Sequence, residues 1–305
     1  MRVLVTGASG HLGSALVPEL LAAGHQVTGL ARSDASAAAL TARGVEVLRG
    51  SLADLDLLGT VASSTDAVVH LAFDHESMLS GDMAGAAALD RQVIETFADA
   101  LAGSGKALTV ASGTIMLAML GLGRPALETD TLVRDDNLPR SETENFVIAL
   151  AERGIRSSAV RIPPVVHSEF DRHGFAHMLI ATARRTGLAG YLGTGANQWP
   201  AAHTLDVGAL FARAAESAPA GTRLHAVGDE GLAMRDIAEV IGRRLNLPVQ
   251  SVPAESAAEH FGFLAAIVGL DNPTSNDLTR ELLAWKPVHR GLLEDLEHGH
   301  YFDAL

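Results

Sequence analysis

The sequence predicts an α/β fold in which a doubly wound parallel sheet is joined to a smaller, mainly helical C-terminal lobe. Three observations lead to this prediction. Strand and helix signals alternate through the first half of the 305-residue chain, which is the pattern of parallel strands linked by crossover helices. A glycine-rich stretch directly follows the first apolar run, at residues 6–13. After Pro163 the alternation gives way to shorter helical runs broken by glycine and proline.

Six short runs rich in apolar and β-branched residues are the candidate strands of the sheet. The segments between them carry apolar residues at helical spacing. We therefore expect strands at 2–6, 26–31, 45–49, 67–71, 107–111 and 157–161, and helices at 11–23, 35–43, 53–62, 83–103 and 142–153. Residues 1–165 then form the sheet domain, and a ligand would lie at the carboxyl ends of its strands.

The second lobe is expected to span residues 166–305 and to supply the substrate side of the site. Asp206 precedes a helical run and is a candidate N-cap, and Trp199 is a candidate pocket residue. No metal site is predicted in the tail, because its acidic and histidine residues lack the spacing of a zinc motif. The candidate helices are 175–185, 207–217, 234–245, 254–268 and 278–283.

Composition narrows the class of protein. A hydrophobic content of 48% with 19% charged residues is enough for a buried core. The formal charge of −13 disfavours nucleic acid and anionic membranes as partners, since both attract basic surfaces. The chain has no cysteine, its longest apolar run is too short to span a bilayer, and no leader segment precedes the first strand. We expect a cytoplasmic protein with a small-molecule substrate.

The stretch from Thr6 to Gly13 predicts a dinucleotide site, because it lies between a strand and an amphipathic helix. Gly7 would make the tight turn, Gly10 would admit a pyrophosphate, and Gly13 would let the helix approach the sheet. The free N–H groups of the helix N-terminus would face the phosphates. The candidate phosphate-binding residues are therefore Gly7, Ser9, Gly10, His11, Leu12 and Gly13.

The spacing Thr-Gly-x-x-Gly-x-x-Gly resembles that of the short-chain dehydrogenase/reductase superfamily. More narrowly, it is similar to the extended branch, which includes nucleotide-sugar epimerases, dehydratases and 3β-hydroxysteroid dehydrogenase-like reductases. The resemblance covers about residues 1–245. It implies a Rossmann fold, a nicotinamide cofactor and a homodimer formed through the helices at 83–103 and 142–153.

The end of the second strand predicts the choice of cofactor. NAD enzymes of this type place an acidic residue there for the ribose hydroxyl, whereas this chain has Ala31 followed by Arg32 and Ser33. A guanidinium fork beside a hydroxyl suits the 2′-phosphate of NADP. The alternative is a solvated Arg32 with Asp34 on the ribose.

Two further segments resemble cofactor-lining stretches of the extended branch. Residues 50–54 resemble its Gly-Asp-Leu-x-Asp segment beside the adenine, with Ser51 in place of the first aspartate. Residues 69–73 resemble its His-Leu-Ala-x strand end, in which we interpret His70 as structural. The resemblance thus adds Ser51, Leu52, Leu71, Ala72, Phe73 and Pro163 to the cofactor-binding candidates.

The catalytic Tyr-x-x-x-Lys pair of the superfamily is absent. The only tyrosines are Tyr191 and Tyr301, and neither has a lysine four residues later. Arg161 resembles the arginine that ends strand six in the extended branch. Glu144 resembles the glutamate that follows the branch's lysine by four residues. Counting back from Glu144 places Arg140 at the lysine position, where it could bind the nicotinamide ribose, and Asp136 at the tyrosine position.

Ser112 follows the fifth strand, where the superfamily keeps its substrate-orienting hydroxyl, and Thr114 is the reserve candidate. Ser112 could instead cap the turn. The proton donor stays open among His75, His167 and Tyr191, a water and the ribose hydroxyl.

The sequence favours an NADPH-dependent oxidoreductase that transfers hydride to a small or medium apolar carbonyl, enone or imine. A non-catalytic NADP-binding sensor is the competing class of protein, and a nucleotide-sugar epimerase or dehydratase is a further alternative.

Overall fold

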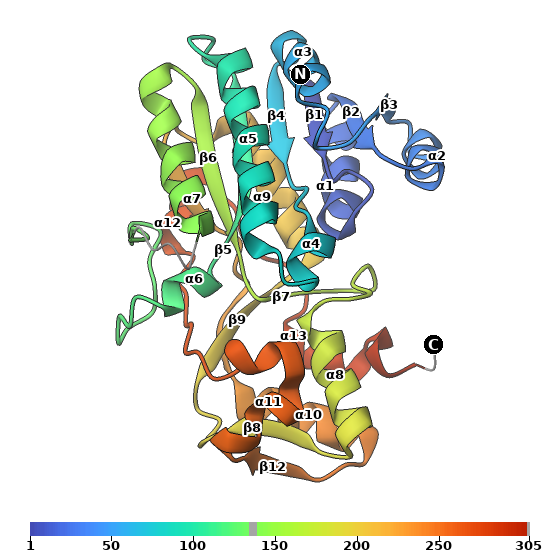
Figure 1. Cartoon of the computed structure of the whole chain (residues 1–305), viewed down its shortest axis with the longest axis vertical. Helices are drawn as coiled ribbons and strands as arrows, with labels where there is room; N and C mark the ends of the chain where they lie inside the picture. The colour runs from blue at the N-terminus through green and yellow to red at the C-terminus, as the bar shows by residue number, and fades with distance from the viewer. Residues whose placement is uncertain (134–138, 304–305) are drawn as a thin grey trace.

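The computed structural model describes residues 1–133 and 139–303, which form a sheet domain above a smaller lobe (Figure 1). Seven parallel strands make the central sheet, in the order β10-β6-β5-β4-β1-β2-β3. From β1 the strand order runs outward in both directions, to β2 and β3 on one side and to β4, β5, β6 and β10 on the other. The place between β1 and β4 is therefore the switch point of a doubly wound sheet. The strands are β1 (Arg2–Thr6), β2 (Gln26–Ala31), β3 (Glu46–Arg49), β4 (Ala67–His70), β5 (Ala107–Gly113), β6 (Arg156–Ile162) and β10 (Thr222–His225).

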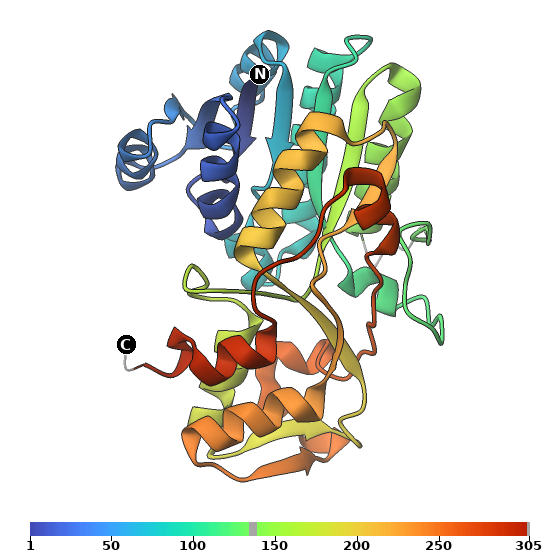
Figure 2. The same ribbon diagram turned by 180° about the vertical axis from the view of Figure 1, so that it is seen from behind.

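Helices cover both faces of the sheet. The helices α1 (His11–Ala22) and α9 (Thr204–Ser217) pack together on one face, and Gly208 permits their close approach, because a Cβ there would lie 2.7 Å from that of Ala15 (Figure 2). The other face carries α3 (Leu55–Ser64), α5 (Met83–Leu101) and α7 (Pro139–Ala149) (Figure 1). Shorter elements complete this domain: α2 (Asp34–Ala42), α4 (His75–Leu79), α6 (Ile115–Ala118), η1 (Leu150–Arg153) and α12 (Asp277–Leu283).

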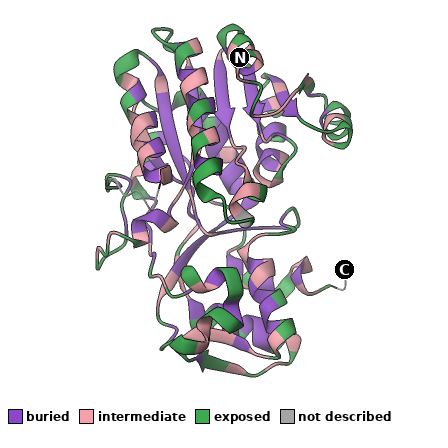
Figure 3. Cartoon of the chain, in the orientation of Figure 1, coloured by how far each residue is buried: buried purple, intermediate pink, exposed green. Residues whose placement is uncertain are grey.

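The smaller lobe is built mainly from helices around a core that includes the fully buried Trp199 (Figure 3). Two small sheets, β11-β9-β7 and β12-β8, brace these helices. The strands are β7 (Val165–His167), β8 (Ala189–Leu192), β9 (Gln198–His203), β11 (Asp229–Ala233) and β12 (Val249–Val252). The helices are α8 (Phe175–Thr186), α10 (Met234–Leu245), η2 (Ala254–Ser256), α11 (Ala257–Phe261), η3 (Gly262–Ala266), α13 (Leu292–His298) and η4 (His300–Phe302).

The predicted fold class is confirmed, with corrections to its elements. The sheet has seven strands rather than six, because β10 returns from the second half of the chain and pairs with β6. The elements α9 and β10 therefore belong to the sheet domain, although residues 166–305 were expected to form the second lobe as one segment. The predicted helix at 254–268 is wrong as one element. It is divided into η2, α11 and η3, with Gly262 at a φ of +55° that interrupts the α-helix.

Within the described ranges, none of the helices combines the length and the apolar character that crossing a bilayer would demand.

Candidate functional site

The glycine turn between β1 and α1 has the geometry of a phosphate cradle. Gly7 has a φ of +71°, and a Cβ there would meet the backbone N of Ala72 at 2.9 Å. A Cβ at Gly13 would lie 2.3 Å from the carbonyl O of Gly7, so α1 approaches the turn too closely for any other residue. Gly10 caps α1 with extended backbone and no side-chain bond. The first amides of α1, including those of His11 and Leu12, thus remain available for an anion.

The end of β2 brings a second arginine to the predicted phosphate site. Arg49 is the sheet partner of Ala31, and its guanidinium donates to the Ser33 carbonyl O at 2.6 Å and to the Asp34 carboxylate at 2.7 Å. Arg32 is exposed and has no hydrogen-bond partner among residues 1–133 and 139–303. Sequence reasoning missed Arg49, although its position at the end of β3 is a usable signal.

Ser33 and Ser51 both have local partners in addition to their predicted cofactor role. Ser33 is the N-cap of α2 and shares a capping box with Ser36. Ser51 donates its hydroxyl to the carboxylate of Asp54 at 3.0 Å, and the bond from the Ser51 amide holds the pKa of Asp54 below its usual value. Ser33 follows the end of β2 and Ser51 follows the end of β3, and each hydroxyl accepts a backbone N–H of its own turn.

The ends of β4 and β5 place Arg140 beside Phe73 and His75. The Arg140 guanidinium lies 4.4 Å from the centre of the Phe73 ring and donates to the carbonyl O of Ala111 at 3.0 Å. His75 begins α4, and its ring meets Phe73 edge-on at 5.4 Å. Covering of the imidazole and the nearby Arg140 charge lower the pKa of His75. Leu71 and Ala72 lie half-buried just before this group, and Pro163 lies buried after β6.

Ser112 belongs to a buried network around Glu144. The hydroxyl of Ser112 donates to the Glu144 carboxylate at 2.6 Å, and Arg161 donates two bonds to the same carboxylate at 3.0 and 2.6 Å. Arg223 donates a further bond at 3.0 Å. Burial alone would raise the pKa of Glu144, but the Arg161 hydrogen bonds and charge, with Ser112 and Arg223, outweigh it and hold the pKa below its usual value.

Thr114 has a different environment from Ser112. It is fully buried, and its hydroxyl accepts a bond from the side chain of Asn272 at 3.0 Å. Any ligand would have to displace this packing to reach the Thr114 hydroxyl, whereas Ser112 is 8% exposed.

His225 is the second buried partner of Arg161. Its Nε2 accepts from Arg161 at 3.1 Å, and its Nδ1 donates to the carbonyl O of Ser275 at 2.7 Å. Burial and the Arg161 charge lower the pKa of His225 from 6.5 to about 3. The histidine therefore stays neutral in the folded protein across the whole physiological range.

This lowered pKa predicts a loss of stability in acid. As the pH falls below 6.5, His225 becomes protonated in the unfolded chain, whereas in the folded protein it binds a proton only near pH 3. The stabilising contribution of this group is complete above pH 6.5, and its loss reaches about 1.4 kcal/mol per pH unit. Urea unfolding at a series of pH values gives the free energy of unfolding, which should fall less steeply with decreasing pH in His225→Gln than in the wild type. His298→Gln, at the exposed tail, is the control. An unchanged slope would contradict the prediction.

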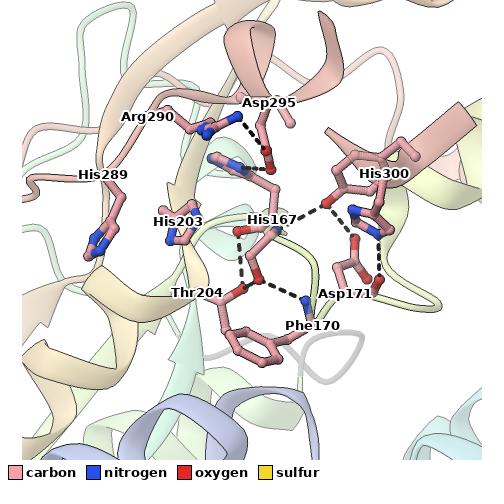
Figure 4. A network of polar contacts seen from close by, with 12 residues as sticks. His167, Phe170, Asp171, His203, Thr204, His289, Arg290, Asp295 and His300 are labelled. Carbon is pink, nitrogen blue, oxygen red and sulfur yellow. Dashed lines mark hydrogen bonds and ion pairs between the residues drawn. The ribbon is translucent and has the colours of Figure 1, made fainter. Parts of the chain in front are cut away.

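His167 lies in a separate polar network between the two lobes (Figure 4). It is fully buried, with Nδ1 bonded to Asp295 of α13 at 2.9 Å and its ring edge-on to His203 at 5.5 Å. Thr204 joins this network to the glycine turn, since its hydroxyl donates to the His167 carbonyl at 3.1 Å and accepts from the His11 ring at 2.8 Å. These contacts indicate that His167 holds the lobes together.

Other residues singled out in the sequence lie elsewhere. Trp199 is fully buried in the core of the smaller lobe, so the expectation that it lines a pocket is wrong. Asp206 is not the N-cap of α9, which is His203; instead its carboxylate accepts the amides of Val288 and His289 at 3.0 and 3.1 Å. Tyr191 lies on β8 under the guanidinium of Arg235. The predicted tyrosine position, Asp136, is outside the described residues.

Comparison with known proteins identifies relatives over the whole chain. Residues 3–114 match the model of the NAD dependent epimerase/dehydratase family. An uncharacterized protein of Schizosaccharomyces pombe is 43% identical over 302 residues, covering 99% of this chain and 100% of its own length. An uncharacterized protein of Saccharomyces cerevisiae is 39% identical, covering 98% of this chain and 99% of its own length.

Solved structures share the fold at low sequence identity. A dTDP-glucose 4,6-dehydratase from Streptomyces venezuelae, solved with NAD bound, has a TM-score of 0.76 at 20% identity, covering 97% of this chain and 95% of that one. A UDP-glucose 4-epimerase from Thermotoga maritima has a TM-score of 0.74 at 18% identity, covering 97% and 96%. The likeness extends through both lobes.

Proposed function

Because the chain belongs to the NAD-dependent epimerase/dehydratase family, we propose that it is an NADPH-dependent reductase of the short-chain dehydrogenase/reductase type. The substrate class is a small or medium apolar carbonyl, enone or imine. The single observation that carries the proposal is the group at the ends of β4 and β5. There a partly buried arginine and a serine hydroxyl lie at the positions that the sequence resemblance assigns to nicotinamide-facing residues.

The glycine turn and the uncapped start of α1 support a dinucleotide at the carboxyl ends of the strands. The glycines of the turn leave room that a Cβ would fill, and the uncapped start of α1 offers amides to a pyrophosphate. Arg32 and Ser33 would hold the 2′-phosphate, while Ser51 and Leu52 would flank the adenine. The Arg49 bond to Asp34 supports NADP over NAD, because it occupies the carboxylate that would otherwise serve the ribose.

The nicotinamide supplies a hydride when it is bound, and the chain supplies position and charge. Arg140 would bind the nicotinamide ribose, but it cannot relay a proton, since a guanidinium stays protonated. Ser112 would orient the substrate heteroatom by donating its hydroxyl to it, which requires the hydroxyl to turn away from Glu144, the acceptor it has in this structure. His75 is a titratable candidate for the proton, and its lowered pKa means that it carries a proton to donate only toward acid pH.

The competing proposal is an NADP-binding sensor that has lost catalysis, which the absent Tyr-x-x-x-Lys pair favours. A nucleotide-sugar epimerase or dehydratase is the third candidate, favoured by the functions of the structural neighbours. NADPH oxidation, followed at 340 nm against a panel of apolar ketones, enones and imines, separates the first two. Turnover of any panel member supports the reductase. Tight NADPH binding with no turnover supports the sensor, and conversion of a nucleotide sugar without net NADPH loss supports the third.

Replacing Ser112 with alanine is expected to lower turnover by about tenfold to a hundredfold while leaving NADPH affinity within about twofold. The physical reason is that the hydroxyl would touch the substrate and Glu144 but not the cofactor phosphates. Steady-state kinetics and cofactor titration check both parts. Thr114→Val is the matched control, because its hydroxyl is bound to Asn272 within the core. Unchanged turnover of Ser112→Ala would assign the serine to structure alone.

A further inference from the structure

Asp90 is a buried carboxylate that the proposed chemistry has not used. It lies on α5, is 3% exposed, and accepts a bond from His70 Nε2 at 3.1 Å. Thr6 accepts a bond from the Ala72 amide, and its hydroxyl is hydrogen-bonded to His70 Nδ1 at 2.6 Å, while Nε2 donates to Asp90. The second oxygen of Asp90, Oδ2, is buried with no hydrogen-bond partner in the part of the chain that the structure describes.

The strand register brings Asp90 and Arg140 to the same end of the sheet. His70, which holds Asp90, pairs with Val110 in the β4–β5 ladder. The next residue, Ala111, is the one whose carbonyl O receives the Arg140 guanidinium. The helices α5 and α7, which carry Asp90 and Arg140, also pack side by side on this face (Figure 1).

Asp90 and Glu144 are the two carboxylates whose charge acts on Arg140, and of the two Asp90 is the one without an arginine partner. Burial lowers the pKa of Arg140, and the negative charges of Asp90 and Glu144 oppose that effect. Glu144 is already neutralised, because Arg161 and Arg223 both donate to its carboxylate. In the described ranges Asp90 has no arginine or lysine within ion-pair distance and its side-chain partner is His70, so the partly buried Arg140 is the arginine on which its charge acts.

We propose that Asp90 is a positioning residue for the nicotinamide half of the cofactor, acting through Arg140. Its carboxylate, held by His70, attracts the guanidinium and keeps it seated on the Ala111 carbonyl, where it would meet the ribose hydroxyls. Arg140 and Asp90 together replace the cation and its support that the missing lysine would otherwise provide. This inference rests on the proposed function, since it requires a dinucleotide in the site.

The test compares a whole cofactor with its adenosine half. Titration of Asp90→Asn with NADPH should show about tenfold weaker binding than wild type, because the Arg140 contact is lost. Binding of adenosine 2′,5′-bisphosphate should change by less than about twofold, since that fragment does not reach Arg140. Arg140→Gln should show the same split, and the double variant should bind NADPH no more weakly than Arg140→Gln alone. Asp99→Asn, on the exposed side of α5, is the control.

Each alternative result identifies which idea fails. If Asp90→Asn weakens both ligands equally, or neither, the positioning role is overturned while the cofactor assignment stands. Additive effects in the double variant overturn the link through Arg140. If the wild type binds neither NADPH nor the fragment, the proposed function fails and this inference fails with it. Should Asp90→Asn not fold, the NADPH-to-fragment ratio for Arg140→Gln and Arg140→Lys decides: a loss confined to NADPH supports the proposal, and an equal loss overturns it.

Discussion

Replacing Arg32 with alanine is expected to weaken NADPH binding by about tenfold to a hundredfold and to leave NADH binding almost unchanged. A charge-assisted contact to a phosphate contributes about 1.5–3 kcal/mol, which corresponds to this range. The side chain is exposed, which leaves it free to reach a 2′-phosphate but favours the lower end of the range. Fluorescence or calorimetric titration with both cofactors measures the effect.

The matched control for Arg32 is Arg43→Ala. Arg43 is also an exposed arginine, but it lies at the opposite end of α2 from Ser33. The Arg43→Ala variant should therefore bind NADPH and NADH as tightly as the wild type. Arg49→Ala tests the second arginine. This variant should also bind NADPH more weakly, because it frees the carboxylate of Asp34 beside the phosphate. Equal losses of NADPH and NADH in Arg32→Ala would remove the assignment to NADP.

Replacing Glu144 with glutamine is expected to lower the free energy of unfolding by about 3–5 kcal/mol. The change leaves Arg161 fully buried without its counter-ion and turns an amide group toward residues that only donate. Because the folded pKa of Glu144 is lowered, its contribution is complete above the unfolded value of 4.5 and is lost as the pH falls through the folded value. The variant should accordingly differ less from wild type in strong acid than at neutral pH.

Urea unfolding at neutral and acid pH measures this effect. Glu95→Gln is the control, since Glu95 forms an ion pair with Arg91 one turn away on the surface of α5 and should cost at most about 0.5 kcal/mol. A loss below about 1 kcal/mol in Glu144→Gln would show that the buried network stabilises little. In that case the position of Ser112 would have to depend on the strand end alone.

Much of the fold could be predicted because its signals are local. Apolar periodicity located β1, β2 and α10 with their observed ends, and the glycine spacing located the turn. The place of the seventh strand in the sheet could not be predicted this way, because Thr222–His225 pairs with β6, which lies far earlier in the chain. The broken helix after Ala254 shows the same limit. The apolar residues keep a helical spacing across Gly262, but the backbone of Gly262, with a φ of +55°, is not helical.

The candidate site shows where sequence reasoning ends. Ser112 was singled out because it follows the fifth strand, and Arg140 because of its spacing to Glu144. Ser112 lies at the end of β5, and Arg140 lies on α7 with its guanidinium at the carbonyl O of Ala111. Their partners were not predicted: Ser112 donates to Glu144, 32 residues later, and Arg140 interacts electrostatically with Asp90 of another helix. Such pairs depend on how helices pack on the sheet, which no local pattern states.

The sequence by itself determined the glycine turn between β1 and α1 and the absence of the Tyr-x-x-x-Lys pair, because both are properties of residue type at fixed spacing. The tertiary structure alone decided that Arg49 joins Arg32, that Glu144 is held by two arginines, and that Asp90 lies near Arg140. The physical reason is that burial and charge act over distances in space. A strand register or a helix packing sets those distances between residues far apart in the chain.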